Sequence, residues 1–192
     1  MNVPEPLSPI SQTAANVGIH GHIVLRDISL TPRYGLKGPN AADWLATQGL
    51  PIPFAPNTWL SLPVGGRILR LGLTEFMVEG DLSLIDSLNT QPRSYGVYPV
   101  VRQDAALALS GPRLQDLLRQ ICSVNLAHLS VGNSVVLTSM AGVGAIVLAE
   151  QQTDEIVFRF WFDGTYGNYL WHTLSGIANE LNSSPTAFSQ LP

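Results

Sequence analysis

The sequence predicts an α+β protein of two similar lobes, each an antiparallel sheet with helices packed on one face. Three observations predict this fold class. Short apolar segments with strand character alternate with helical patterns, two of these patterns follow a Gly-Pro pair, and the same order of segments occurs twice. The 192 residues are enough to bury a core, because a chain of this length loses about two-thirds of its unfolded surface on folding.

The N-terminal residues 1–18 are expected to form an extended or flexible arm. They contain Pro4, Pro6 and Pro9 among Ser, Gln and Asn, and no apolar period marks a helix or a strand. The first lobe is then predicted to span residues 19–95 and the second lobe residues 96–192.

The clearest sign of a repeat is a Gly-Pro motif. Leu36-Lys37-Gly38-Pro39 has a counterpart 73 residues later, Leu109-Ser110-Gly111-Pro112. Proline is favoured at the first helical position, because its missing N–H has no intrahelical partner to lose there. We therefore predict helices over about 39–48 and 112–122. Their predicted buried residues are Ala41, Ala42, Trp44 and Leu45 in the first helix, and Leu114, Leu117, Leu118 and Ile121 in the second.

Each half continues with three strand-like segments and a closing helix. The strands are predicted near 57–60, 66–71 and 75–79 in the first half, and near 133–136, 142–148 and 156–162 in the second. The closing helices are predicted near 81–88 and 165–181. The matching order indicates an internal duplication. A chance resemblance is the alternative, since Gly-Pro is common at helix starts.

The charge pattern points to protein partners and away from nucleic acid. The net charge is −4, and no cluster of Lys or Arg forms the basic patch that a nucleic-acid binder needs. Only 12% of residues are charged, compared with about 25% in a typical soluble domain. Nine arginines, one lysine and four tryptophans match the composition of protein interfaces. The sequence therefore favours a subunit of a larger assembly over a merely apolar monomer.

The remaining composition predicts a cytoplasmic protein with no membrane partner. The longest apolar stretch, 142–149, is far shorter than a membrane span, and no secretory leader is expected in the first 25 residues. The single cysteine, Cys122, excludes an internal disulfide and suits a reducing compartment.

No catalytic residue and no metal ligand is predicted. Among the four histidines only His20 and His22 are close, and they are interpreted as surface residues of a strand. Cys122 is interpreted as a core thiol, and Asp163 as the N-cap of the last helix. The sequence lacks a phosphate-binding loop and a nucleophile elbow, and the glycines at 142 and 144 fit a β-turn better than a dinucleotide motif.

A series of motifs between about residues 26 and 181 resembles the gamma subunits of heterotetrameric sarcosine oxidases. No single motif is specific, but all of them occur in the order found in that family, and one departure is Tyr34 where Phe is usual. The motifs are Arg33 to Pro39, Pro56-Asn57 with Trp59, Leu71-Gly72 to Glu75-Phe76, Arg102-Gln103-Asp104, Cys122 to Leu126, Thr138 with Met140 to Val143, and an aromatic end of Trp161, Asp163, Tyr166, Tyr169, Leu170 and Trp171.

The resemblance implies a fold related to the folate-binding module of glycine-cleavage T proteins and similar aminomethyltransferases. It also implies a hetero-oligomer with alpha, beta and delta subunits that oxidises sarcosine to glycine and passes the one-carbon unit to tetrahydrofolate. FAD, FMN, NAD, tetrahydrofolate and zinc are implied in the partner subunits and none is implied in this chain. No catalytic residue carries over.

Two alternatives stay open. The partner flavoenzyme could oxidise a related N-methylated compound instead of sarcosine. The chain could also be a stand-alone, folate-binding aminomethyltransferase-like protein. In that case Trp59, Tyr98 and Arg102 would stack on or pair with the pteridine and glutamate parts of the ligand.

Overall fold

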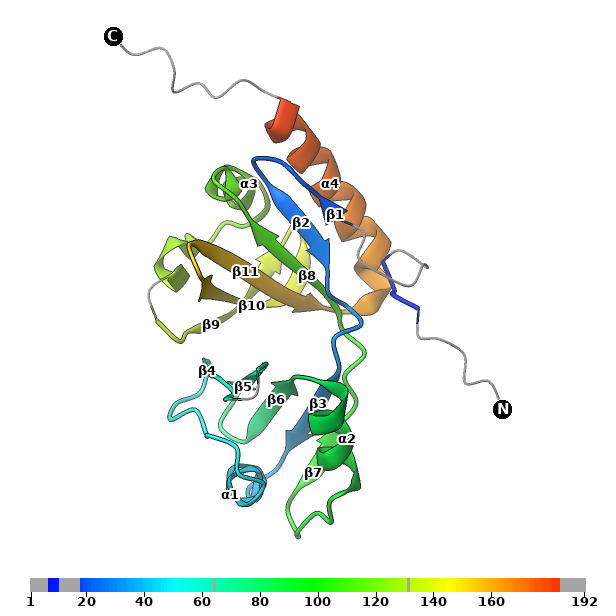
Figure 1. Ribbon diagram of the computed structural model, residues 1–192, viewed down its shortest axis with the longest axis vertical. Coiled ribbons are helices and arrows are strands. Elements are labelled where there is room, and N and C mark those ends of the chain that lie inside the picture. Colours follow the sequence, from blue (N-terminus) through cyan, green and yellow to red (C-terminus); the bar gives the residue numbers. More distant parts are fainter. Residues whose placement is uncertain (1–6, 11–17, 64, 131, 184–192) are drawn as a thin grey trace. The chain divides into compact units, whose positions relative to one another are not determined.

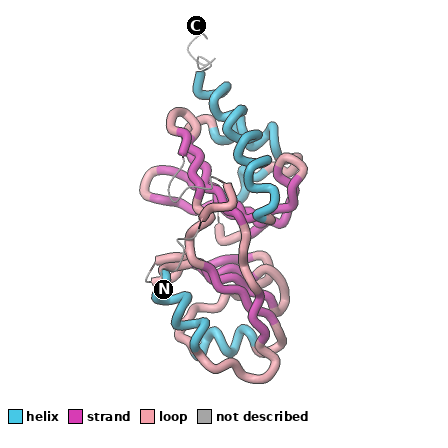
Figure 2. The backbone as a smooth tube through the Cα atoms, turned by 90° about the vertical axis from the view of Figure 1, so that its right-hand side faces the viewer, coloured by secondary structure: helices cyan, strands magenta, loops and turns pink. Residues whose placement is uncertain are grey.

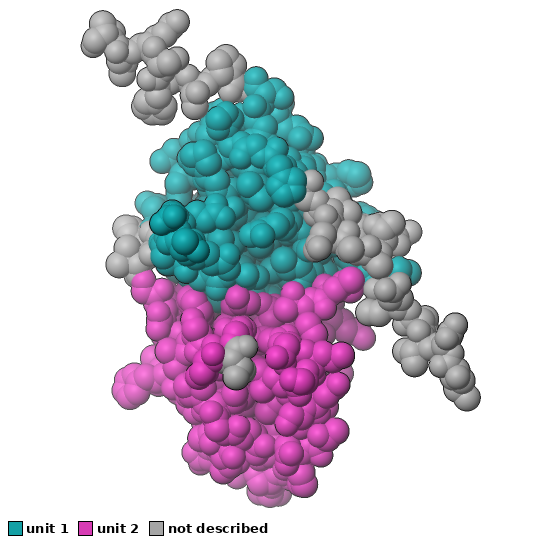
Figure 3. All heavy atoms as spheres, viewed as in Figure 1, with its two compact units in different colours: residues 1–29, 104–130, 138–192 teal, residues 30–103, 131–137 magenta. Residues whose placement is uncertain are grey.

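The computed structural model describes residues 7–10, 18–63, 65–130 and 132–183 (Figure 1). These residues belong to two compact units, shown in different colours in Figure 3. Unit 1 comprises 1–29, 104–130 and 138–192, and unit 2 comprises 30–103 and 131–137. Both units therefore combine segments from both halves of the chain, which differs from the predicted division at residues 95 and 96.

Unit 2 contains a five-stranded antiparallel sheet and two helices. The strand order is β4 (Thr58–Ser61), β5 (Arg67–Arg70), β6 (Glu75–Glu79), β3 (Arg33–Lys37) and β7 (Tyr98–Val100). The helices are α1 (Ala41–Thr47) and α2 (Leu82–Thr90). The three predicted strands of the first half and both of its predicted helices are confirmed, with ends shifted by at most about two residues.

Both helices of unit 2 cover one face of this sheet (Figure 2). Side chains alternate between faces along a strand, so Leu36, Ile68 and Val78 point to the helices. Trp44 of α1 and Ile85 of α2 pack against them in one buried cluster. A fully buried large aliphatic side chain contributes about 1.5–3 kcal/mol, so this cluster is the main source of the stability of unit 2.

Unit 1 contains a six-stranded sheet, apart from residues 135–137 at the start of its last strand, which belong to unit 2. Its order is β1 (Gly18–Ile19), β2 (Val24–Asp27), β8 (Ala105–Ser110), β11 (Glu155–Phe162), β10 (Val143–Gln152) and β9 (Val135–Met140). The helices are α3 (Leu114–Ile121) and α4 (Gly167–Ser183), with short 3₁₀ helices η1 (Leu126–Ser130) and η2 (Gly164–Tyr166). Helix α3 contacts α4, and all four of its predicted core residues are buried.

The helices α1 and α3 begin two residues after Pro39 and Pro112, so these prolines do not occupy the predicted first helical position. A glycine turn precedes each helix. Gly38 and Gly111 have φ values of 127° and 111°, a conformation that side chains with a Cβ rarely adopt. A Cβ on Gly38 would meet the carbonyl oxygen of Gly96, and one on Gly111 would meet that of His22.

Two strands pair with the sheet that contains the other half of the chain. Strand β2 precedes β3 in the sequence but pairs with β8, whereas β7 precedes β8 but pairs with β3. The strand orders β4-β5-β6-β3-β7 and β9-β10-β11-β8-β2 therefore correspond position by position. The hydrogen bonds correspond too: Asn40 N donates to Gly96 O at 3.3 Å, and Arg113 N donates to His22 O at 3.1 Å.

Part of the predicted N-terminal arm is packed on unit 1. Ser8 and Ile10 are buried, and the Ser8 hydroxyl donates a hydrogen bond to the Asp27 carboxylate. Gly167, at the start of α4, leaves room for the carbonyl oxygen of Pro9, which a Cβ would approach to 2.6 Å. The rest of the predicted arm, 1–6 and 11–17, lies outside the described residues.

Candidate functional site

A cavity of about 1010 Å³ lies in unit 1, between α3, the segment that follows it and the hairpin of β10 and β11. Leu118 and Phe158 are apolar residues of its wall, and Arg119 comes from α3. Asp154 comes from the hairpin turn, and Glu155 is the first residue of β11. Acid–base or nucleophilic catalysis needs a nucleophile and a base within hydrogen-bonding reach. None of the described residues lining the cavity is a histidine. Two hydrogen bonds there are local, from Arg119 to Asp116 within α3 and from the Ala127 amide to the Asn125 side chain.

Cys122 is buried, as the sequence predicts for a core thiol, although it also lines this cavity. Its sulfur lies 3.8 Å from the hydroxyl oxygen of Thr138, a weak contact with a neutral group. A reactive thiol is normally partly exposed and next to a positive charge. The contacts of Cys122 therefore fit a structural role.

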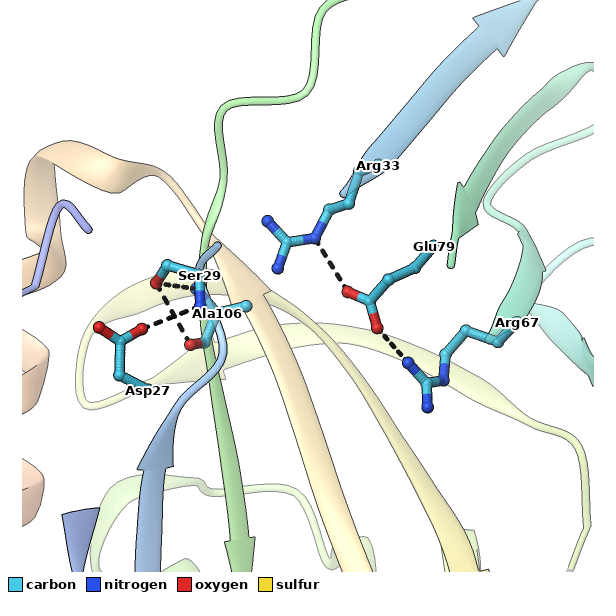
Figure 4. A network of polar contacts seen from close by, with 6 residues as sticks. All are labelled: Asp27, Ser29, Arg33, Arg67, Glu79 and Ala106. Atoms are coloured by element: carbon cyan, nitrogen blue, oxygen red, sulfur yellow. Dashed lines mark hydrogen bonds and ion pairs between the residues drawn. The ribbon is translucent and has the colours of Figure 1, made fainter. Parts of the chain in front are cut away.

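The strongest charged cluster is in unit 2, on the sheet face opposite the helices. Glu79 is fully buried, and its carboxylate accepts hydrogen bonds from Arg33 Nε at 2.9 Å and from Arg67 Nη1 (Figure 4). All three lie in register across β3, β6 and β5. A carboxylate enclosed by two guanidinium groups is stabilised as a structural ion pair and is not presented to a substrate.

A second polar cluster, in unit 1, ties the end of β2 to β8. The Asp27 carboxylate accepts the Ser29 amide at 2.9 Å, and the Ser29 hydroxyl accepts the Ala106 amide at 3.0 Å (Figure 4). Together with the bond from Ser8, these contacts fix the N-terminal segment and the strand end. The cluster satisfies backbone groups where the ladder stops, which is again a structural task.

The structure does not bring the three folate candidates together. Trp59 is in β4 and Tyr98 in β7, the two edges of the five-stranded sheet, so about 19 Å of sheet separates them. Arg102 follows β7, lies over Gly35 and donates to the Glu75 carboxylate at 2.7 Å, a partner that the sequence did not predict. Trp59 is 6% exposed, and its indole N–H has no hydrogen-bond partner among the described residues. Folate binding by these residues stays a prediction.

Two aspartates act as helix caps. The Asp163 carboxylate accepts the Thr165 amide at 2.8 Å, which confirms the predicted N-cap, although the helix that it caps is η2, just before α4. Asp81 caps α2 by accepting the Leu84 amide at 2.8 Å. These backbone hydrogen bonds lower the pKa of both carboxyl groups below the ordinary value, because they stabilise the ionised form.

The histidine pair offers no metal site. His20 and His22 are exposed, but they lie in the bend between β1 and β2, so the predicted strand placement is wrong. Within the ranges that the structure describes, no group of three or more His, Cys, Asp or Glu residues could hold a metal ion. In the same ranges no helix is long and apolar enough to cross a membrane.

Comparison with known proteins gives matches in structure. No family model matches the chain, and no curated protein does. A chain of the heterotetrameric sarcosine oxidase from Corynebacterium sp. U-96, in complex with pyrrole 2-carboxylate, superposes with a TM-score of 0.71 and 22% identity, over 88% of this chain and 91% of that one. The glycine cleavage system aminomethyltransferase T from Bartonella henselae superposes with a TM-score of 0.61 and 17% identity, over 83% of this chain and 47% of that one.

These two matches confirm the fold that the motif series implies. The chain spans nearly the whole matched chain of the sarcosine oxidase, but only about half of the aminomethyltransferase. At these identities the likeness establishes the fold, and a function has to be argued from the residues.

Proposed function

We propose that the chain is the non-catalytic gamma subunit of a cytoplasmic, heterotetrameric sarcosine oxidase. The observation that carries the proposal is the nearly complete overlap, in both directions, with one chain of such an enzyme. In this proposal alpha, beta and delta subunits surround the chain. They hold FAD, FMN, NAD, tetrahydrofolate and zinc, and they oxidise sarcosine to glycine while the one-carbon unit passes to tetrahydrofolate.

The distribution of charge supports a subunit that is covered by partners. Five of the chain's ten cationic side chains are no more than 19% exposed and are used in ion pairs inside the units. They are Arg33, Arg67, Arg102, Arg113 and Arg159. The exterior therefore carries even less charge than the composition indicates, and depletion of charge is typical of the core of protein interfaces.

We also infer that the two units arose by internal duplication with exchange of the leading strands. The equivalent strand orders support this origin, and so do the equivalent glycine turns at Gly38 and Gly111. A duplication of this kind supplies two sheets and two helix layers without requiring a catalytic site in either unit.

Co-purification from the source cell tests the proposed function. The tagged, full-length chain is expected to elute with stoichiometric partner proteins, with bound flavin visible by absorbance, and with sarcosine-dependent reduction of that flavin. Recovery of the chain by itself, with no flavoprotein in the eluate, would contradict the proposal. A flavoprotein that reacts with another N-methylated amine and not with sarcosine would instead change only the substrate.

The alternative, a stand-alone folate-binding module, is favoured by one observation. The fold resembles an aminomethyltransferase, and the buried indole N–H of Trp59 lacks a partner among the described residues, so it could serve a ligand. Titration of the purified chain with a reduced folate distinguishes the two functions. Saturable quenching of tryptophan fluorescence that disappears in Trp59→Phe supports folate binding, whereas an unchanged spectrum supports the subunit.

A further inference from the structure

Two loops of unit 2 present large apolar side chains almost entirely to solvent. Phe54, in the loop between α1 and β4, is 98% exposed, and Leu73, in the turn between β5 and β6, is 77% exposed. Single exposed apolar residues are ordinary on protein surfaces. These two are different because the same side chain holds both of their loops.

That side chain is Arg70, at the end of β5. Its guanidinium donates to Pro53 O at 3.1 Å and to Phe54 O at 2.9 Å in one loop. It also donates to Leu73 O at 2.8 Å in the other. The planar fork of an arginine fixes the geometry of several acceptors at once, so the two loops are held in a defined relation. The backbone positions that carry Phe54 and Leu73 are therefore held in a fixed relation before any partner binds.

Several backbone groups of the first loop are hydrogen-bonded within the chain. The Thr58 hydroxyl donates to Ala55 O at 2.5 Å, and Asn57 N donates to Arg70 O at 2.7 Å. Three further positions, 51, 53 and 56, are prolines and have no N–H. Covering this surface therefore leaves few hydrogen bonds unmade, and unmade hydrogen bonds are a main cost of burying a loop.

The two loops themselves carry no charged side chain. Residues 51–58 and 71–74 contain no Asp, Glu, Lys or Arg, and the Arg70 guanidinium between them is engaged by backbone carbonyl oxygens of both loops. A nucleic acid or an anionic ligand would require a cluster of exposed cations here. An uncharged apolar pocket matches the two loops, because neither Phe54 nor Leu73 brings a charge to desolvate.

We propose that Phe54 and Leu73, held by Arg70, form an apolar anchor that inserts into an uncharged apolar pocket of a partner subunit. This inference rests on the proposed function, because it names the surface through which the subunit docks. Apolar anchors that are preorganised and become desolvated on binding carry a large share of the binding energy of an interface.

The test uses the complex purified through the tagged chain, with wild type compared with Phe54→Ser and with Leu73→Ser. Dissociation constants are measured by titrating each chain into partner subunits stripped of it. Each substitution is expected to raise the dissociation constant at least about 30-fold. Leu82→Ser is the matched control, since Leu82 is 62% exposed in the same unit but outside the anchor, and it is expected to change binding less than about threefold.

Arg70→Met tests the positioning role separately. It keeps both anchor side chains but removes the fork, so binding should weaken by about tenfold, and the loss should not add to that of Phe54→Ser because both act through one feature. Circular dichroism and thermal unfolding check that each variant is folded. The exposed substitutions at 54 and 73 should leave the melting temperature within about 2 °C of wild type.

Different failures have different meanings. If wild type forms the complex and the anchor variants bind equally well, the anchor is wrong and the proposed function stands. If wild type binds no partner at all, both are wrong. If the free chain self-associates and Phe54→Ser abolishes that association, the pocket belongs to a second copy, and the partner-subunit assignment is overturned. Binding of the chain to neutral lipid vesicles through Phe54 would overturn it in favour of a membrane surface.

Discussion

Replacing Glu79 by Gln gives the most direct test of the internal architecture of unit 2. The substitution keeps the size of the side chain but removes the negative charge that pairs with both Arg33 and Arg67, whose side chains are 3% and 9% exposed. The Gln amide can accept from one guanidinium but turns a donor toward the other. Two buried positive charges are then left next to each other with no carboxylate between them.

The size of the expected loss in stability follows from the burial of the Glu79 ion pairs. Removing one partner of a buried ion pair costs about 3–5 kcal/mol, because the remaining charge stays desolvated. Since whole domains are stable by only about 5–15 kcal/mol, this loss is a large part of the total. For a chain of this length it lowers the melting temperature by about 10 °C. Glu155→Gln, at the exposed first residue of β11, is the control and should change stability little.

The assay is urea unfolding followed by circular dichroism. A second variant shows whether the loss of stability comes from unpaired charge or from packing. In the triple variant Arg33→Met, Glu79→Met, Arg67→Met the buried charges are gone together, so stability should return to near that of wild type. A loss below about 1 kcal/mol in Glu79→Gln would refute the reasoning, since it would mean that both arginines relax into water. Failure of the triple variant to recover would assign the effect to packing instead of charge.

Three further predictions concern single positions. Gly111→Ala should lower the free energy of unfolding by at least about 2 kcal/mol, and by clearly more than Gly142→Ala does. Both glycines have positive φ, but only at Gly111 would the added Cβ meet a carbonyl oxygen; chemical denaturation of the two variants compares them. Ser110→Ala should leave stability unchanged or raise it by about 1 kcal/mol, because its buried hydroxyl has no partner among the described residues. Asp81→Ala should destabilise the protein above pH 3.8, and the difference in stability from wild type should shrink as the pH falls below that value. The reason is that the hydrogen bond from Leu84 N lowers the pKa of Asp81 in the folded state. Unfolding measured from pH 7 to pH 2 shows the trend.

Local patterns in the sequence predicted most of the secondary structure. The short apolar run within Glu75–Glu79 predicted β6 with its bounds, and the apolar spacing of α3 predicted its buried face. These features depend on residues close in the chain. The starts of α1 and α3 were placed two residues early, because Pro39 and Pro112 were assigned to the first helical position but lie before the helices.

Long-range pairing could not be predicted in the same way. Nothing within β2 shows that it pairs with β8 instead of its sequence neighbour β3, since strand character is the same for either partner. The same holds for Arg102, whose partner Glu75 lies 27 residues away. The anchor was missed because a sequence does not show whether a phenylalanine between prolines points inward or outward.

The fixed geometry of the anchor decides between two explanations of the sparse charge. In a merely apolar monomer, leftover hydrophobic side chains would lie on the surface without a common structural support. Here the guanidinium of one arginine hydrogen-bonds to the backbone of two loops, and both Phe54 and Leu73 on these loops are exposed. Ordering loops costs conformational entropy and gains nothing for an isolated chain that keeps these side chains in water. The gain comes only when another surface covers them, and this argument supports the proposed role of the chain as a subunit.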